Sequence, residues 1–121
     1  MIHEELCTYE VCKLAKEKGF NCKCYHYYQK GELQTDKCFN RYNKGVDSIC
    51  SAPTQSLLQR WLREEKSIDF EIYPIFINGV RVYTCYAYAP KLNKPKKFNY
   101  FDTYELALSD ALKYALENLV I

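Results

Sequence analysis

The fold is decided by the stretch IYPIFINGVRVYTCYAYAP, residues 72–90. Asn78-Gly79 in its middle is typical of a two-residue type I′ turn, because that turn requires positive φ at both central residues. The alternating apolar residues on either side predict two antiparallel strands. Ile77 then pairs with Val80, and each further pair lies one residue farther out on both strands.

The predicted hairpin has two different faces, because successive side chains of a strand point to opposite sides. The first face is apolar, and we expect helices to cover it. It comprises Ile68, Phe70, Ile72, Pro74, Phe76, Tyr83, Cys85 and Ala87. The second face is polar and aromatic far from the turn and aliphatic beside the turn. It comprises Asp69, Glu71, Tyr73, Thr84, Tyr86, Tyr88, Ile75, Ile77, Val80 and Val82.

Pro74 indicates where the hairpin lies in its sheet. Counted from the turn, it occupies a non-hydrogen-bonded position opposite Tyr83, so its missing N–H would have pointed away from the partner strand. The strand that contains Pro74 is therefore predicted to be an edge strand, and the strand Tyr83–Tyr88 an interior one.

Three helices are predicted around this hairpin. The first covers residues 8–18, where Gly19 is suited to end it in a left-handed conformation. The second begins at Thr54 as N-cap. The last begins with a capping box formed by Asp102 and Glu105. Its apolar residues keep a helical period. These are Leu108, Ala111, Leu112, Ala115 and Leu119.

A weak internal repeat suggests the overall architecture. Residues 14–32 align with residues 62–80, so that a strand at residues 20–28 and its return strand match the hairpin. We predict one α+β domain, residues 1–121, with the order αββ-αββ-α. Its four-stranded antiparallel sheet has the strand order 1-2-4-3, with helices mainly on the Phe70 face, and residues 90–101 form a basic linker.

Composition limits the classes of protein. The net charge of +2 is too small to indicate nucleic-acid binding by itself, and no apolar stretch is long enough for a membrane span. The N-terminal sequence MIHEELCTYE lacks the basic start and apolar run of a signal peptide. Seven cysteines, an odd number, then indicate reduced thiols and a cytoplasmic location.

Several cysteines raise the question of a metal site. Cys22, Cys24 and His26 share one face of the first predicted strand, and Cys38 and Cys50 follow downstream. Thiolate and imidazole are zinc ligands, but this spacing lacks the paired cysteines of a structural zinc site. We favour buried thiols and predict no metal and no cofactor, with zinc kept as the alternative.

The sequence offers little for catalysis. His3 and His26 are the only histidines, and no nucleophile elbow, phosphate-binding glycine loop or HExxH helix is present. Asp102 and Glu105 are explained as a helix cap rather than as an acid–base pair. We predict that the protein is not an enzyme.

The basic linker gives an alternative function. Its lysines could neutralise phosphates, and its aromatic rings could stack on bases, with Tyr86 and Tyr88 extending the aromatic surface. The candidate nucleic-acid residues are Lys91, Lys94, Lys96, Lys97 and Tyr100. We favour a solvated connecting loop, because no RNA-binding motif accompanies these residues.

The favoured function is binding of another protein through the second face of the hairpin. The candidate partner-binding residues are Tyr73, Tyr86, Tyr88, Ile75, Ile77, Val80 and Val82. A homodimer through the aliphatic end of this face is one interpretation, because a two-fold axis lets one patch cover itself. In the other interpretation, the C-terminal helix folds back over this face.

Two segments carry a resemblance to known proteins: SAPTQSLLQRWLREE at 51–65 and FDTYELALSDALKYALENL at 101–119. Together with KLAKEKGF and the turn YHYYQKGEL, they resemble small uncharacterised proteins from prophages and mobile elements of gut Bacteroides-type anaerobes. The resemblance implies a bacterial cytosolic setting and a mobile-element origin, but no activity. The stretch TYELALSDALKYAL is also similar to HicB-type antitoxins, which would imply protein or RNA partners.

Overall fold

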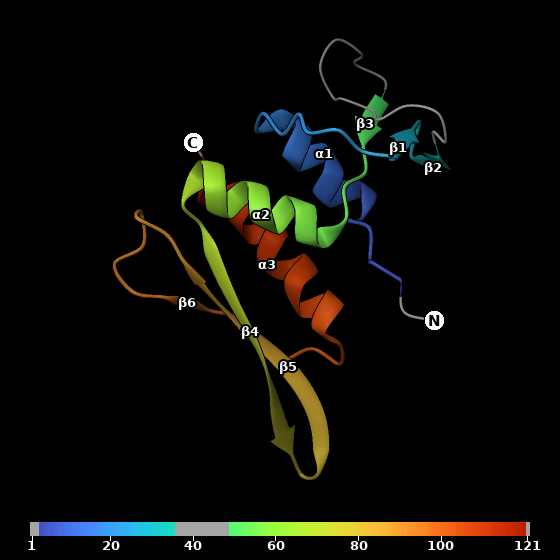
Figure 1. The fold of residues 1–121 in the computed structure, drawn as a ribbon. Coiled ribbons are helices and arrows are strands. Elements are labelled where there is room, and N and C mark those ends of the chain that lie inside the picture. The colour runs from blue at the N-terminus through green and yellow to red at the C-terminus, as the bar shows by residue number, and fades with distance from the viewer. Residues whose placement is uncertain (1–2, 36–48, 121) are drawn as a thin grey trace.

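The computed structural model of the chain describes residues 3–35 and 49–120. In these residues the chain has an α+β fold with three helices and two separate antiparallel sheets (Figure 1). The elements are α1 (Tyr9–Glu17), β1 (His26–Gln29), β2 (Glu32–Thr35), β3 (Ile49–Ser51), α2 (Gln55–Lys66), β4 (Asp69–Ile77), β5 (Val80–Tyr88), β6 (Lys96–Lys97) and α3 (Tyr104–Asn118).

Each helix begins at a threonine. The hydroxyls of Thr8, Thr54 and Thr103 accept hydrogen bonds from the backbone N–H three residues further on, at 3.3, 3.1 and 3.1 Å. The predicted capping box of Asp102 and Glu105 is therefore wrong by one residue. Thr103 has the extended backbone of an N-cap, with φ −130° and ψ 157°, so its hydroxyl takes the position that was assigned to the Asp102 carboxylate.

The predicted four-stranded sheet is wrong. The strands form two three-stranded sheets, ordered β2-β1-β3 and β4-β5-β6. The first hairpin does not join the second, because β3 occupies the free side of β1 and β6 occupies the free side of β5. The predicted element order αββ-αββ-α is replaced by αβββ-αβββ-α, and the predicted strand order 1-2-4-3 by the orders of these two sheets.

The second hairpin matches its predicted register. Ile77 pairs with Val80 and the pairing continues outward to Asp69 and Tyr88. Asn78 and Gly79 have φ values of 50° and 79°, as a type I′ turn requires. The edge prediction is also confirmed, since β4 lies at the edge of its sheet and β5 lies between β4 and β6.

The predicted linker, residues 90–101, is wrong in its second half. Lys96 and Lys97 pair with β5, the N–H of Phe98 donates to the carbonyl of Cys85 at 2.9 Å, and Phe101 exchanges two hydrogen bonds of 2.7 Å with Tyr83. The Thr84 hydroxyl, fully buried, donates to the Phe98 carbonyl at 2.9 Å. These bonds hold residues 96–101 along β5, with Lys96 and Lys97 as the strand β6 and Phe101 as an isolated bridge.

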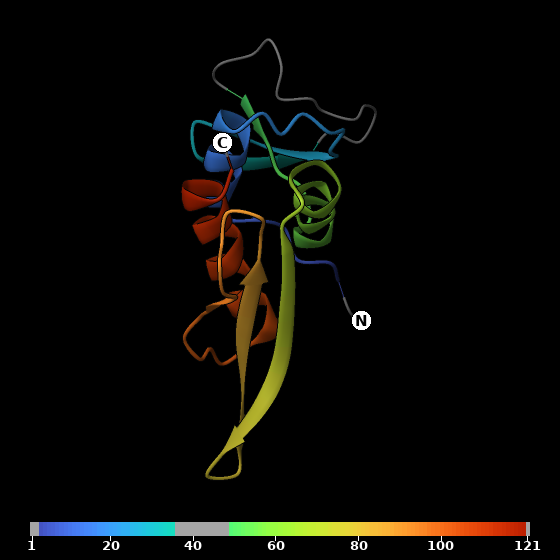
Figure 2. The ribbon, with the colours of Figure 1, turned by 90° about the vertical axis from the view of Figure 1, so that its left-hand side faces the viewer.

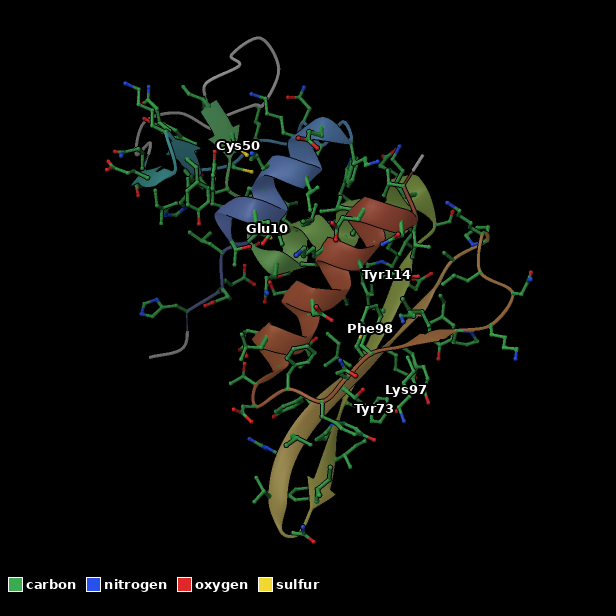
Figure 3. The ribbon with its side chains drawn as sticks, turned by 180° about the vertical axis from the view of Figure 1, so that it is seen from behind. Glu10, Cys50, Tyr73, Lys97, Phe98 and Tyr114 are labelled. Carbon is green, nitrogen blue, oxygen red and sulfur yellow. The ribbon has the colours of Figure 1, made fainter. Side chains whose placement is uncertain are left out.

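The core lies between the helices and one face of the hairpin. Burial of the predicted apolar face is confirmed at Ile68, Cys85 and Ala87, and all five predicted apolar residues of α3 are buried. Lys113 of α3 forms an ion pair of 2.8 Å with Glu10 of α1 on the outside of this core (Figure 3). No helix within residues 3–35 and 49–120 is long and apolar enough to cross a membrane.

Candidate protein-binding surface

The end of the β4–β5 hairpin projects from the rest of the molecule. Near the middle of β5, Tyr83 pairs with Phe101 and packs edge-to-face on Tyr104 with ring centroids 6.1 Å apart. Beyond that point the two strands continue past the end of α3 (Figure 2), on the side away from the small β2-β1-β3 sheet (Figure 1). We call residues 75–82 the arm.

The arm exposes apolar side chains on both of its faces. Phe76 is 67% exposed, Val80 60% and Ile77 43%. Phe76 belongs to the face predicted to be covered by helices, and this part of the prediction is wrong because the arm reaches past them. Ile75 and Val82 are half-buried.

The aliphatic end of the second face is not covered by the C-terminal helix. Helix α3 lies on the opposite face, where Ala111 is buried against Cys85 and Ala87. The interpretation in which α3 folds back over this face and buries Ile75 and Val82 is therefore wrong, and both side chains are half-buried. We call the face of the β4-β5-β6 sheet opposite α3 the open face.

Tyrosines occupy the middle of the open face. The rings of Tyr73 and Tyr86 stack at a centroid distance of 5.9 Å with 21° between their planes. Lys97, the cross-strand partner of Tyr86, places its ammonium 5.6 Å from the ring centroid of Tyr100. Figure 3 labels Tyr73 and Lys97, which lie at the level of the sheet where β6 pairs with β5. Desolvation and a hydrogen bond with Tyr86 raise the pKa of Tyr73 to about 12.

The end of the open face farthest from the arm is acidic. Tyr88 donates a hydrogen bond of 3.1 Å to the carboxylate of Glu71, and Asp69 is exposed beside them. Desolvation and this hydrogen bond raise the pKa of Tyr88, because the bond stabilises the protonated phenol. The open face therefore runs from carboxylates through tyrosines to aliphatic side chains.

The structure does not gather the predicted nucleic-acid lysines into one stripe. Lys91 donates to the carbonyl of Asn118 at 2.9 Å, at the C-terminus of α3. Lys96 lies on the α3 side of the sheet, 5.2 Å from the ring centroid of Tyr114. Lys97 is on the open face, and Lys94 is exposed in the connection before β6. Only Lys97 and Tyr100 of that candidate set adjoin the tyrosines.

The cysteines lie mainly inside the molecule. Cys24 and Cys50 are buried as predicted, Cys22 is only half-buried, and Cys38 lies outside the described residues. His26 is half-buried in β1. Among residues 3–35 and 49–120, no group of His, Cys, Asp and Glu side chains is arranged to hold a metal ion.

Two buried cysteines that the sequence analysis did not consider, Cys7 and Cys12, lie in the same core cluster as Cys50. Hydrogen bonds with Cys50 and Cys7 raise the pKa of Cys12, and burial raises it further. The bond with Cys12 lowers the pKa of Cys50, and Lys16 adds to that effect. Burial raises the pKa of Cys24 to about 11.

Comparison with known proteins adds nothing to this geometry: no family model, curated protein or solved structure matches the chain. The resemblance to mobile-element proteins stays a prediction that rests on its quoted segments.

Proposed function

We propose that this protein is a small, non-enzymatic accessory protein of a prophage or mobile element that binds another protein through the open face and the arm. The observation that carries the proposal is the exposure of Phe76, Ile77 and Val80 on a projecting hairpin. Apolar side chains gathered at one exposed place are a mark of contact surfaces.

The tyrosines support a protein partner. Tyr73 and Tyr86 are half-buried, and Tyr100 is 48% exposed. Tyrosine is enriched in protein interfaces, because its ring is apolar and its hydroxyl hydrogen-bonds at the wet rim. Tyr73 and Tyr86 also stack on each other, so little side-chain freedom is left to lose when a partner binds.

Nucleic-acid binding is the second candidate, because Tyr73, Tyr86 and Tyr100 lie together with Lys97 on the open face. Stacked rings beside a lysine are the usual means of holding single strands. The charges favour a protein instead. The acidic end of the open face would repel phosphates, and Lys91 and Lys96 are directed away from the open face.

Site-specific photo-crosslinking in the native host tests the proposal. A benzophenone amino acid at position 86 is expected to capture a protein. The same probe at position 33 is the control, since Leu33 is 47% exposed on the other sheet and should capture none. A probe at 86 that captures nothing beyond the control contradicts protein binding.

Fluorescence anisotropy with mixed DNA and RNA oligonucleotides separates the two candidates. We expect no binding at physiological salt. Salt-sensitive binding that is lost in Lys97→Glu and in Tyr100→Ala would instead establish the open face as a nucleic-acid surface.

A further inference from the structure

We infer that the protein bound by the open face is a second copy of this chain, with the two open faces packed antiparallel so that each arm covers the tyrosines of the other. This inference rests on the proposed function and names its partner. A two-fold axis would relate the copies, so that every contact occurs twice.

The arm has few contacts of its own to hold it. Three residue pairs, Ile75–Val82, Phe76–Arg81 and Ile77–Val80, extend the ladder beyond Tyr83. A two-stranded hairpin is marginally stable in water unless a further layer packs on it. In the described part of the chain no third strand pairs with these residues, since β6 pairs with β5 at Tyr86 and Ala87 and the Phe101 bridge lies at Tyr83. A layer from outside the chain would supply the missing contacts.

Two open faces packed antiparallel complement each other, because the side chains change in chemical type along the face. The arm end carries four aliphatic side chains, the middle carries tyrosines, and the far end carries Asp69 and Glu71. Antiparallel packing places each aliphatic end on the other copy's Tyr73 and Tyr86. The carboxylates then lie at the two outer rims, in water. Parallel packing would oppose like carboxylates, which is unfavourable.

Packing by faces is favoured over pairing of the two β4 edges. The backbone N–H and C=O groups that point outward from this edge belong to the non-hydrogen-bonded positions of the β4–β5 ladder. These positions include Phe70, Ile72, Pro74 and Phe76. Pro74 lacks the N–H needed at the centre of such an edge-to-edge ladder. The open face has no comparable interruption.

The size of the face sets the expected strength. Strands β4 and β5 have nine residues each. A strand of that length spans about 30 Å, and two to three strands are about 10–14 Å wide. The projected face is thus on the order of 350 Å², of which only the tyrosine and aliphatic parts overlap in this packing, well below the roughly 800 Å² that each partner gives to a standard interface. We therefore expect a weak dimer with a micromolar dissociation constant.

Sedimentation velocity from low to high micromolar concentration tests the dimer. The wild type is expected to shift from monomer to dimer, and the double variant Ile77→Lys, Val80→Lys to stay monomeric. Leu33→Lys is the matched control, because Leu33 is as exposed as Ile77 but lies on the other sheet. It should dimerise like the wild type. Circular dichroism verifies that each variant is folded.

A crosslinking measurement keeps the inference testable if the double variant fails to fold. A benzophenone at position 80 in otherwise wild-type protein, mixed with isotopically heavy chain, should link to the partner's peptide that contains Tyr73 or Tyr86. Wild type that stays monomeric at high micromolar concentration, or links formed only outside the open face, overturns the inference.

Failure of the inference is distinguishable from failure of the proposed function. A monomeric chain whose position 86 still captures a different protein in the host refutes the second copy and retains protein binding. A monomeric chain that captures nothing refutes both.

Discussion

Replacing Phe98 with alanine tests whether residues 96–98 belong to the sheet. The Phe98 side chain is 7% exposed and is buried against Cys85, Ala87 and Ala111. Its ring packs edge-to-face on Tyr114 of α3 at a centroid distance of 5.3 Å. If residues 90–101 were a solvated linker, as predicted from the sequence, truncating this side chain would not change the stability of the protein.

The magnitude follows from these contacts. Burying a phenylalanine side chain contributes about 1.5–3 kcal/mol, and an edge-to-face aromatic pair adds about 0.5–1.5 kcal/mol. The sum agrees with the roughly 3–5 kcal/mol measured for Phe-to-Ala changes in protein cores. We expect Phe98→Ala to lower the free energy of unfolding by about 3 kcal/mol, a large part of a typical total of about 5–15 kcal/mol.

Urea denaturation followed by tryptophan fluorescence measures this loss. The single tryptophan, Trp61, packs edge-to-face on buried Phe20 at 5.4 Å, so its emission reports on the core. Tyr100→Ala is the matched control, since Tyr100 lies in the same segment but is 48% exposed. Its effect should stay within about 0.5 kcal/mol, the size usual for surface positions. A loss below about 1 kcal/mol for Phe98→Ala refutes the packing of residue 98 against the sheet.

Two further predictions concern single side chains. Thr103→Ala should lower the free energy of unfolding by about 1 kcal/mol, because Thr103 is the N-cap of α3. Asp102→Ala should have a smaller effect in the same urea experiment. The reverse ranking contradicts the assignment of Thr103 as the cap. Ultraviolet titration should show a phenol of pKa about 12, assigned to Tyr73 if Tyr86→Phe lowers it toward the usual 10. Because the folded pKa of Tyr73 lies above the unfolded one, its contribution to stability is complete below pH 10 and is lost as the pH rises toward 12.

The local signals in the sequence were strong where a few residues determine the backbone. Asn78-Gly79 alone set the register of nine residue pairs, because a two-residue type I′ turn leaves no freedom in the pairing that follows. The missing N–H of Pro74 then assigned β4 to the edge. Helix α2 begins at Thr54, its predicted N-cap.

The sheet arrangement could not be predicted, because two very short strands decide it. Strand β3 has three residues and β6 has two, too few for alternation to be recognised. After β6 the register also shifts: Phe98 bonds to Cys85, whereas Phe101 pairs with Tyr83, so three steps on one strand match two on the other. Such a bulge breaks the period of two that marks a strand.

The unrecognised strand β6 explains what was missed in the candidate surface. Tyr73 and Tyr86 were assigned to the open face from their spacing in the hairpin. Tyr100 and Lys97 join them only because β6 runs along β5, and a segment interpreted as a linker carries no information about which face its side chains occupy. Lys96, next to Lys97, lies on the opposite side for the same reason.

The buried thiols have a consequence for measuring motion in this molecule. Cys12 and Cys85 are both inaccessible, at 0% exposure, and they lie in different core clusters: Cys12 is on the buried side of α1, and Cys85 of β5 is packed with Ala111 of α3. An alkylating reagent can reach either one only while its own region is transiently open. The labelling rate of each cysteine thus measures how often the core cluster around it opens. A partner bound to the open face should slow the alkylation of Cys85, because binding stabilises the closed state of that region. The alkylation rate of Cys12 should stay unchanged.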